Sequence, residues 1–228
     1  MTTTRLSLAT AALFAVAPLS VLAGQATIQP AAARFSTVVN GRAEVVTFRG
    51  RSAVHLVAAP ETAGKDRNVL AILGGEEFKD GTITLDVSGA PRPGMPDDAR
   101  GFVGLSFRTG EHGEWSEVFY LRPTNGRADD QVRRNHSVQY VSDPEYPWYR
   151  LRNEHPGEYE SYVDIEPAVW TNVRIVVSGT TARLFVNGAA QPNLVVKDLK
   201  HGDVSGRIAL WAHIQTDAYF GAVTVQPK

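Results

Sequence analysis

Alternation of apolar and polar residues at period two is the feature that most constrains how this chain can fold. The segment from Gly81 to Val87 places Ile83, Leu85 and Val87 on one face and threonine or aspartate on the other. From residue 43 onward no window carries a sustained apolar stripe at the 3.6-residue spacing of a helix. Such alternation is typical of half-buried antiparallel strands, so the chain is predicted to be all-β.

Turn residues divide the chain into many short strands. Twenty glycines and 13 prolines are spread along it, and the dipeptide Asn187-Gly188 ends one expected hairpin. Further strands are expected over residues 102–108, 172–178, 182–186, 206–214 and 219–225. Helix is limited to about one turn near 129–133. Numerous strands without a helical layer favour a two-sheet antiparallel β-sandwich of the jelly-roll type.

The first 23 residues resemble a secretory signal peptide. A single cation, Arg5, precedes a short apolar stretch, and small residues allow cleavage after Ala23. A membrane helix is the alternative, but the stretch is short for one. We therefore expect a periplasmic or secreted protein with no membrane span after signal removal. Residues 24–42 are predicted to be a lead-in, and 43–228 a single β-sandwich domain.

Composition excludes several classes of function. The chain has 23 basic and 24 acidic residues, so no overall positive charge points to nucleic acid. It has no cysteine, which excludes disulfides, thiolate metal sites and a thiol nucleophile. Nucleophile-elbow, zinc-protease, phosphate-loop and dinucleotide motifs are also missing from the sequence.

The stretch from Trp170 to Gly188 resembles the hairpin of concanavalin A-like lectins and glucanases, laminin-G-like modules among them. Segments 78–87, 101–108 and 206–225 follow the same pattern, so the resemblance covers roughly residues 70–225. It implies a concanavalin A-like jelly roll and a carbohydrate ligand or substrate. It does not imply one activity, because one fold hosts many functions.

Within this superfamily the chain is most similar to secreted bacterial domains of the 3-keto-disaccharide hydrolase kind. Two phrases of that family differ here: Phe102-Val103-Gly104 stands in place of Asn-Ser-Gly, and residues 119–122 stand in place of Glu-x-Gln. The Glu-x-Asp-x-x-Glu phrase of laminarinase-type glucanases does not occur in the sequence. The sequence therefore argues against laminarinase activity.

Residues 115–162 contain six of the seven tyrosines and two of the four tryptophans, together with several arginines. Aromatic rings stack on sugar rings, and arginines bond the hydroxyls, so this window suits a sugar site. The alternative is ordinary packing of a long excursion held by Arg–carboxylate pairs. Alternation turns one set of side chains to the polar face, where we expect one concave surface: Arg108, Tyr120, Arg122, Glu160, Tyr162, Trp211 and His213.

A basic cluster follows in the same window: Arg133, Arg134, Asn135 and His136. Two guanidiniums beside an imidazole suit the carboxylate of an acidic sugar, or a phosphate. Equally, Asp129 and Asp130 are close enough in sequence to pair with both arginines. The same two aspartates, with Asn125, suit calcium or another divalent cation, although an Asp-Asp turn is the commoner use.

Three functions remain open. The first is a carbohydrate-binding module that holds a glycan on the Tyr/Trp/Arg surface. The second is a glycoside hydrolase or lyase acting on a 3-keto-glycoside, with Glu160 and either His136 or His213 as acid and base. The third is a structural envelope module that contacts protein.

Overall fold

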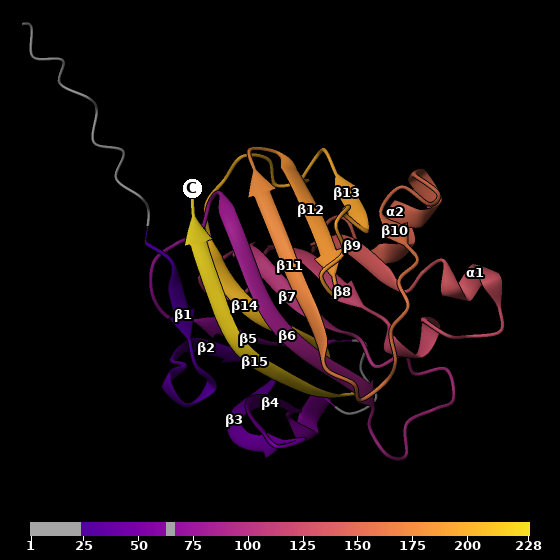
Figure 1. Cartoon of the computed structure of the whole chain (residues 1–228), viewed down its shortest axis with the longest axis horizontal. Helices are drawn as coiled ribbons and strands as arrows, with labels where there is room; N and C mark the ends of the chain where they lie inside the picture. The colour runs from indigo at the N-terminus through magenta and orange to yellow at the C-terminus, as the bar shows by residue number, and fades with distance from the viewer. Residues whose placement is uncertain (1–23, 63–66) are drawn as a thin grey trace, which may run out of the picture.

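The computed structural model describes residues 24–62 and 67–228, which build two antiparallel sheets stacked face to face (Figure 1). The predicted signal peptide lies outside the described residues. The front sheet in Figure 1 runs β13-β12-β11-β6-β15-β4-β3, and β1 also pairs with β15. The second sheet runs β10-β9-β8-β7-β14-β5-β2. The predicted two-sheet sandwich is confirmed.

The strands of the front sheet are β1 (Ala26–Ile28), β3 (Gly41–Phe48), β4 (Arg51–Ala58), β6 (Gly81–Pro91), β11 (Thr171–Ser178), β12 (Thr181–Val186), β13 (Leu194–Val196) and β15 (Thr216–Pro227). Those of the second sheet are β2 (Phe35–Val39), β5 (Asn68–Leu73), β7 (Val103–Thr109), β8 (Ser116–Leu121), β9 (Val138–Asp143), β10 (Glu160–Ser161) and β14 (Arg207–His213). The predicted strands match β6, β7, β11, β12, β14 and β15 to within a few residues.

The segment expected to be a lead-in, 24–42, is part of the sandwich. Strand β1 pairs with β15, and β2 pairs with β5 at the edge of the second sheet. No clear alternation marks these two strands in the sequence, because both are short and largely exposed or half-buried.

Alternating side chains of both sheets fill the space between them. Val103 lies against Gly89 of the front sheet, where an added Cβ would approach the valine Cγ1 to 2.6 Å. Leu105 and Phe107 follow at period two and are fully buried. Each such side chain contributes about 1.5–3 kcal/mol by leaving water. Because Val103 points inward, Gly104 and its neighbours in register point to the outer face of the second sheet.

A β-bulge interrupts this alternation at the end of β7. The register with β14 shifts between the pairs Ser106–Ala209 and Thr109–Arg207, and Arg108 takes a positive φ of 46°. Two residues of β7 therefore face one of β14, which reverses the parity of Arg108.

The helical segments are short: η1 (Pro30–Ala32), η2 (Pro60–Thr62), η3 (Pro123–Asn125), α1 (Gln131–Arg134) and α2 (Trp148–Glu154). The Asp130 side chain caps α1, close to the predicted turn. Helix α2 was not predicted; it begins after Pro147 and buries Leu151. Within 24–62 and 67–228 we find no helix with the length and apolar character of a membrane span.

Candidate functional site: a groove on the outer face of the second sheet

Two aromatic rings stack on the outer face across a glycine. Tyr120 of β8 and Trp211 of β14 both lie in register with Gly104 of β7, the strand between them. Because Gly104 has no side chain, the rings meet above it, with centroids 4.9 Å apart and planes inclined by 24°. Phe102 adds a third ring 5.4 Å from Tyr120. The alternation of the sequence predicted this face for both Tyr120 and Trp211.

This aromatic floor belongs to a groove made of two hollows of about 140 and 630 Å³. The hollows share Phe102, Trp148 and His213. Trp211 is only 3% exposed, whereas Trp148 and Tyr149 of α2 are 41% and 63% exposed. The surface open to a ligand is therefore the rim supplied by α2, with Trp211 and Tyr120 as the floor beneath it.

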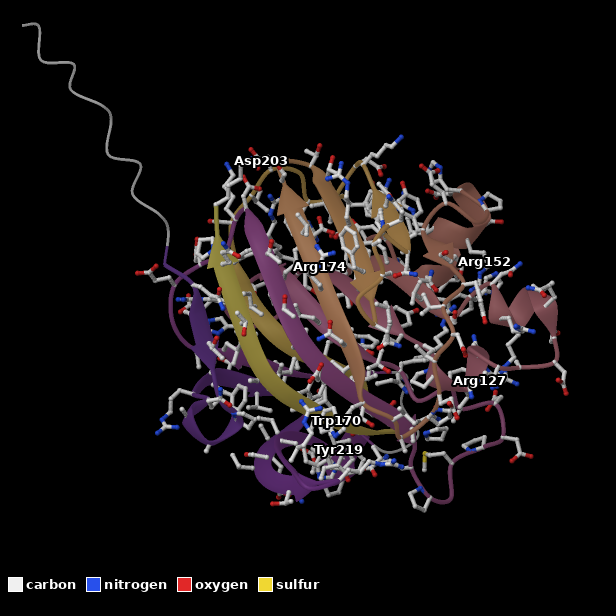
Figure 2. All side chains as sticks on the ribbon, viewed as in Figure 1. Arg127, Arg152, Trp170, Arg174, Asp203 and Tyr219 are labelled. Carbon is white, nitrogen blue, oxygen red and sulfur yellow. The ribbon has the colours of Figure 1, made fainter. Side chains whose placement is uncertain are left out.

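A buried ionic network closes one end of the groove. Arg152 donates two hydrogen bonds to the Glu160 carboxylate, from Nε to Oε1 at 2.7 Å and from Nη2 to Oε2 at 2.6 Å. Arg122 Nη1 donates to Glu160 Oε2 at 3.3 Å, and its Nη2 donates to the Tyr120 hydroxyl at 2.9 Å and to Gln139 Oε1. The Glu160 side chain is 2% exposed. Figure 2 places Arg152 at the side of the molecule that carries the two α-helices.

The network sets the charge states of its members. Burial raises the pKa of Glu160, but the hydrogen bonds and charge of Arg152, with His136 and Arg122, outweigh it, so this pKa is lowered overall. Burial also lowers the pKa of His136, despite the carboxylate of Glu160 at 3.5 Å from its Nε2. At neutral pH Glu160 is therefore ionised and His136 neutral.

The carboxyl of Asp143 has a pKa that is shifted in the opposite direction to that of Glu160. The residue ends β9 and lines the smaller hollow beside Trp148 and His213. Burial raises the pKa of Asp143 to about 6, an effect that the charge of His201 opposes. A carboxyl with this pKa carries a proton at mildly acid pH, as a general acid must.

Two buried donors on this face have no acceptor among the described residues. They are the indole Nε1 of Trp211, which lines the smaller hollow, and the amide Nε2 of Gln139, whose Oε1 accepts from Arg122 and Tyr120. A buried donor without a partner costs about 1–3 kcal/mol, so such groups point to a ligand or water that completes them.

The structure brings together seven of the predicted site residues: Tyr120, Arg122, Arg133, His136, Glu160, Trp211 and His213. It separates four others. Three of these, Arg134, Asn135 and Tyr162, lie outside the groove lining. The guanidinium carbon of Arg134 lies 5.2 Å from the ring centroid of Tyr162, and the side chain of Asn135 accepts a hydrogen bond from Gln131.

Arg108 is the fourth, and the bulge explains why its predicted position is wrong. Its guanidinium is fully buried and donates to the carbonyl oxygens of Gly179 at 2.8 Å and Gly202 at 2.6 Å, and to the carboxylates of Asp80 and Asp203. It ties the ends of both sheets together and does not line the groove.

The sequence reasoning missed four residues that line the groove, Arg100, Asp143, Trp148 and Arg152, and the buried Gln139 that bonds Tyr120 and Arg122. Gln139 had a usable signal, since it is a polar residue within the apolar strand β9. Arg100 lies in a loop and Trp148 and Arg152 lie on α2, where alternation gives no direction, and Asp143 is the last residue of β9.

The structure gives no support to a divalent cation at Asn125, Asp129 and Asp130. Asn125 Oδ1 accepts from Arg133 Nε at 2.9 Å, and Asp130 Oδ1 accepts the backbone N–H of Arg133. In the part of the chain that the structure describes, no cluster of three or more histidine, aspartate or glutamate side chains has the arrangement of a metal site. Nor do the two aspartates form an ion pair with Arg133 or Arg134 there.

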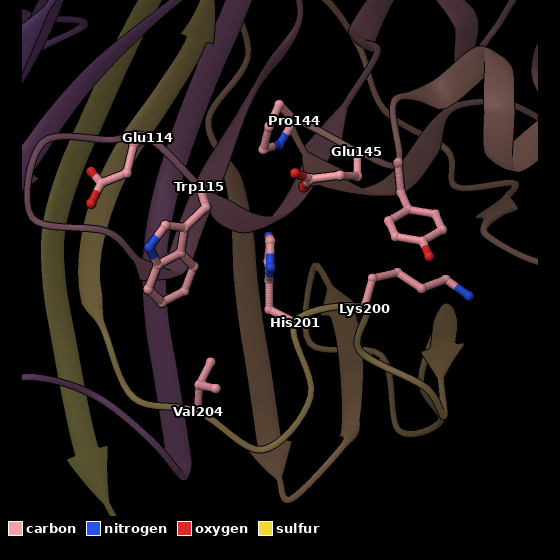
Figure 3. Close-up of a pocket in the computed structure, with 8 residues that line it drawn as sticks. Glu114, Trp115, Pro144, Glu145, Lys200, His201 and Val204 are labelled. Atoms are coloured by element: carbon pink, nitrogen blue, oxygen red, sulfur yellow. The ribbon is translucent and has the colours of Figure 1, made fainter.

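A hollow of about 510 Å³, the second hollow, shares no lining residue with the groove and includes Pro144, Glu145 and Tyr146 in its own lining (Figure 3). Trp115, Tyr146, Lys200 and His201 line it, with the Trp115 and His201 rings 5.1 Å apart. The His201 Nε2 is 2.9 Å from the carbonyl oxygen of Asp143, and the Lys200 ammonium is engaged by Asp198 and Tyr159.

No protein-family model matches the chain, and no curated protein sequence matches it. Among solved structures, the carbohydrate-binding module CBM66 from Bacillus subtilis matches with a TM-score of 0.55 and 13% identity, over 81% of this chain and 91% of that one. A β-1,3-1,4-glucanase (lichenase) derived from a mouse hindgut metagenome matches with a TM-score of 0.49 and 14% identity, over 81% and 83%. At these identities the likeness concerns the fold alone. The chain has the concanavalin A-like β-sandwich that its sequence resembles.

Proposed function

We propose that the chain is a carbohydrate-binding domain that holds a glycan in the groove. The observation that carries the proposal is a buried donor, Trp211 Nε1, that lines a groove with an aromatic rim and lacks an acceptor among the described residues. Gln139 Nε2, on the strand residue paired with Tyr120, is a second such donor on the same face. Sugar hydroxyls and ring oxygens are acceptors of the required kind, and exposed rings supply the stacking surface. The fold shared with a carbohydrate-binding module supports the same function.

The rim residue best placed to stack on a sugar is Trp148. It is 41% exposed, lines both hollows, and is held from one side by Arg152, whose guanidinium carbon lies 4.9 Å from the ring centroid. A ring held in this way loses little side-chain freedom on binding.

The test is isothermal titration calorimetry of the mature chain with a panel of neutral and acidic oligosaccharides. Trp148→Ala is expected to weaken the best ligand by at least about tenfold, or about 1.4 kcal/mol. Trp115→Ala is the matched control, because it removes the same ring from the second hollow. Equal loss in both variants, or no binding of any oligosaccharide at millimolar concentration, would overturn the proposal.

A second candidate, a glycoside hydrolase or lyase, is favoured by Asp143. The acid–base pair expected from the sequence is poorly suited, because Glu160 is ionised, buried and gripped by Arg152. Asp143, with a pKa of about 6, has the protonation state that a general acid needs, and His213 lines the same hollow.

This second function is tested by incubating the chain with glycosides and 3-keto-disaccharides and analysing the products by mass spectrometry. An enzyme gives new products that vanish in Asp143→Asn, while calorimetric binding persists. Absence of product from every substrate that binds would rule it out and leave the binding domain.

We also propose export to the periplasm or the medium, on the strength of the sequence of residues 1–23 alone. Expression of the full chain in a Gram-negative host, followed by mass spectrometry of the periplasmic fraction, should show a mature N-terminus at Gly24. An uncleaved chain in the cytoplasm would refute this.

A further inference from the structure

Arginines gather along the larger hollow of the groove, and their positive charge is incompletely balanced. Four guanidiniums line it or its floor, from Arg100, Arg122, Arg133 and Arg152. Against them stand three carboxylates: Asp98 and Asp130 in the lining, and Glu160 behind it. With His136 neutral, the hollow holds more positive than negative charge.

The four arginines differ in whether their side chain is paired with a carboxylate. Arg122 and Arg152 both form ion pairs with the carboxylate of Glu160. Within residues 24–62 and 67–228, the Arg133 side chain bonds only neutral oxygens, those of the Asn125 side chain and of the hydroxyl and carbonyl of Thr124.

Arg100 makes one long bond of 3.4 Å, from Nη1 to the carbonyl of Asp97. Burial and the charge of Arg133, with a smaller effect from Arg122, lower the pKa of Arg100, although Asp98 opposes the shift. Arg100 and Arg133 are thus neighbouring cations with no carboxylate bonded to either side chain among the described residues.

We propose that the groove is selective for an acidic sugar, whose anionic group is bound by Arg100 and Arg133. A planar guanidinium matches the two oxygens of a carboxylate, and it also accepts a sulfate ester. The acidic group lies at the arginine end, while the sugar ring of the same or the next residue stacks at Trp148. This inference rests on the proposed function, because it names the class of glycan that the same groove takes.

The cluster differs from the basic run expected at residues 133–136. Arg134 and Asn135 turn away from the groove, and Arg100, 33 residues upstream of Arg133, takes their place. The loop that carries Arg100 is brought to η3 by two bonds to the Arg100 carbonyl oxygen, from the backbone N–H and hydroxyl of Thr124.

The test compares each acidic ligand with its own neutral form. Oligomers of galacturonate, mannuronate and glucuronate are titrated beside their carboxyl-reduced counterparts, which keep the linkage and lose the charge. A sulfated galactan forms a further arm. We expect one acidic oligomer to bind at least about tenfold more tightly than its neutral form, and the advantage to shrink between 50 and 500 mM NaCl.

Arg100→Gln and Arg133→Gln are expected to remove that advantage, so that each variant binds the acidic oligomer and its reduced form with similar affinity. Arg100→Gln removes a single long hydrogen bond, so we expect the variant to fold as the native chain does. Arg127→Gln is the matched control: it removes the same charge from a side chain that is paired with Asp164 and Glu166 outside the groove lining, on the side of the molecule where Figure 2 also labels Arg152.

The outcomes separate this inference from the function on which it rests. If the chain binds the sulfated galactan and Arg133→Gln loses that binding, the result supports the anion site and assigns it to sulfate. Equal affinity for acidic and reduced oligomers overturns the acidic selectivity and leaves the glycan-binding groove standing. Absence of binding to every oligomer overturns both.

Discussion

The raised pKa of Asp143 makes a quantitative prediction about stability. The shift from the ordinary value of 3.8 to about 6 means that the folded chain holds a proton that the unfolded chain releases. The resulting stabilisation is fully present below about pH 3.8 and is lost as pH rises through about 6. At 1.36 kcal/mol per pKa unit, the loss is about 3 kcal/mol between pH 4 and pH 7.5.

Asp143→Asn replaces the titrating carboxyl with a neutral amide of similar shape. Relative to the native chain, the free energy of unfolding of the variant should therefore rise by about 3 kcal/mol between pH 4 and pH 7.5. For a chain of this size that corresponds to a relative rise in Tm of about 6–12 °C. The measurement is thermal unfolding followed by circular dichroism at pH 4, 5, 6, 7 and 7.5, with both proteins in the same buffers.

Asp164→Asn is the matched control, because the sign is reversed there. The hydrogen bond and charge of Arg127 lower the pKa of the exposed Asp164, so its contribution is present at neutral pH and is lost in acid. A Tm difference between Asp143→Asn and the native chain that stays constant from pH 4 to pH 7.5 would refute the reasoning.

Three further substitutions test the architecture by urea unfolding. Gly104→Ala should cost about 1–3 kcal/mol, because the new Cβ would lie 2.6 Å from the Tyr120 Cα; a neutral result would contradict the role of Gly104. Arg108→Met should cost about 3 kcal/mol, since it removes the fully buried charged donor that bonds the carbonyls of Gly179 and Gly202; almost no change would contradict this structural role. Glu160→Gln should cost about 3 kcal/mol at pH 7 by leaving two arginines without a counter-charge. The lowered pKa of Glu160 means that its contribution is present at neutral pH and is lost as the pH falls through that lowered pKa, so a stability difference that persists in strong acid would count against the network.

The fold was predictable because its signal is local. In β6 and β11 every second residue is buried, and that alternation is visible in the sequence. The same rule placed Tyr120 and Trp211 on one face correctly. It failed at Arg108, where a bulge reverses parity, and a bulge depends on how two strands pair and not on the residues of one strand.

The site was less predictable than the fold. Alternation left Trp211 on a polar face, but the covering of that face depends on α2, a seven-residue helix too short to show a helical period. The approach of Arg100 to Arg133 depends on a loop contact at Thr124, which only the folded chain defines.

The short segment from Asp143 to Tyr149 contributes residues to the lining of both the groove and the second hollow. Asp143, Trp148 and Tyr149 line the groove, whereas Tyr146 lines the second hollow, where His201 bonds the Asp143 carbonyl. Because one short segment lines both the groove and the second hollow, we expect a ligand that displaces this segment on the groove side to change the shape of the second hollow as well.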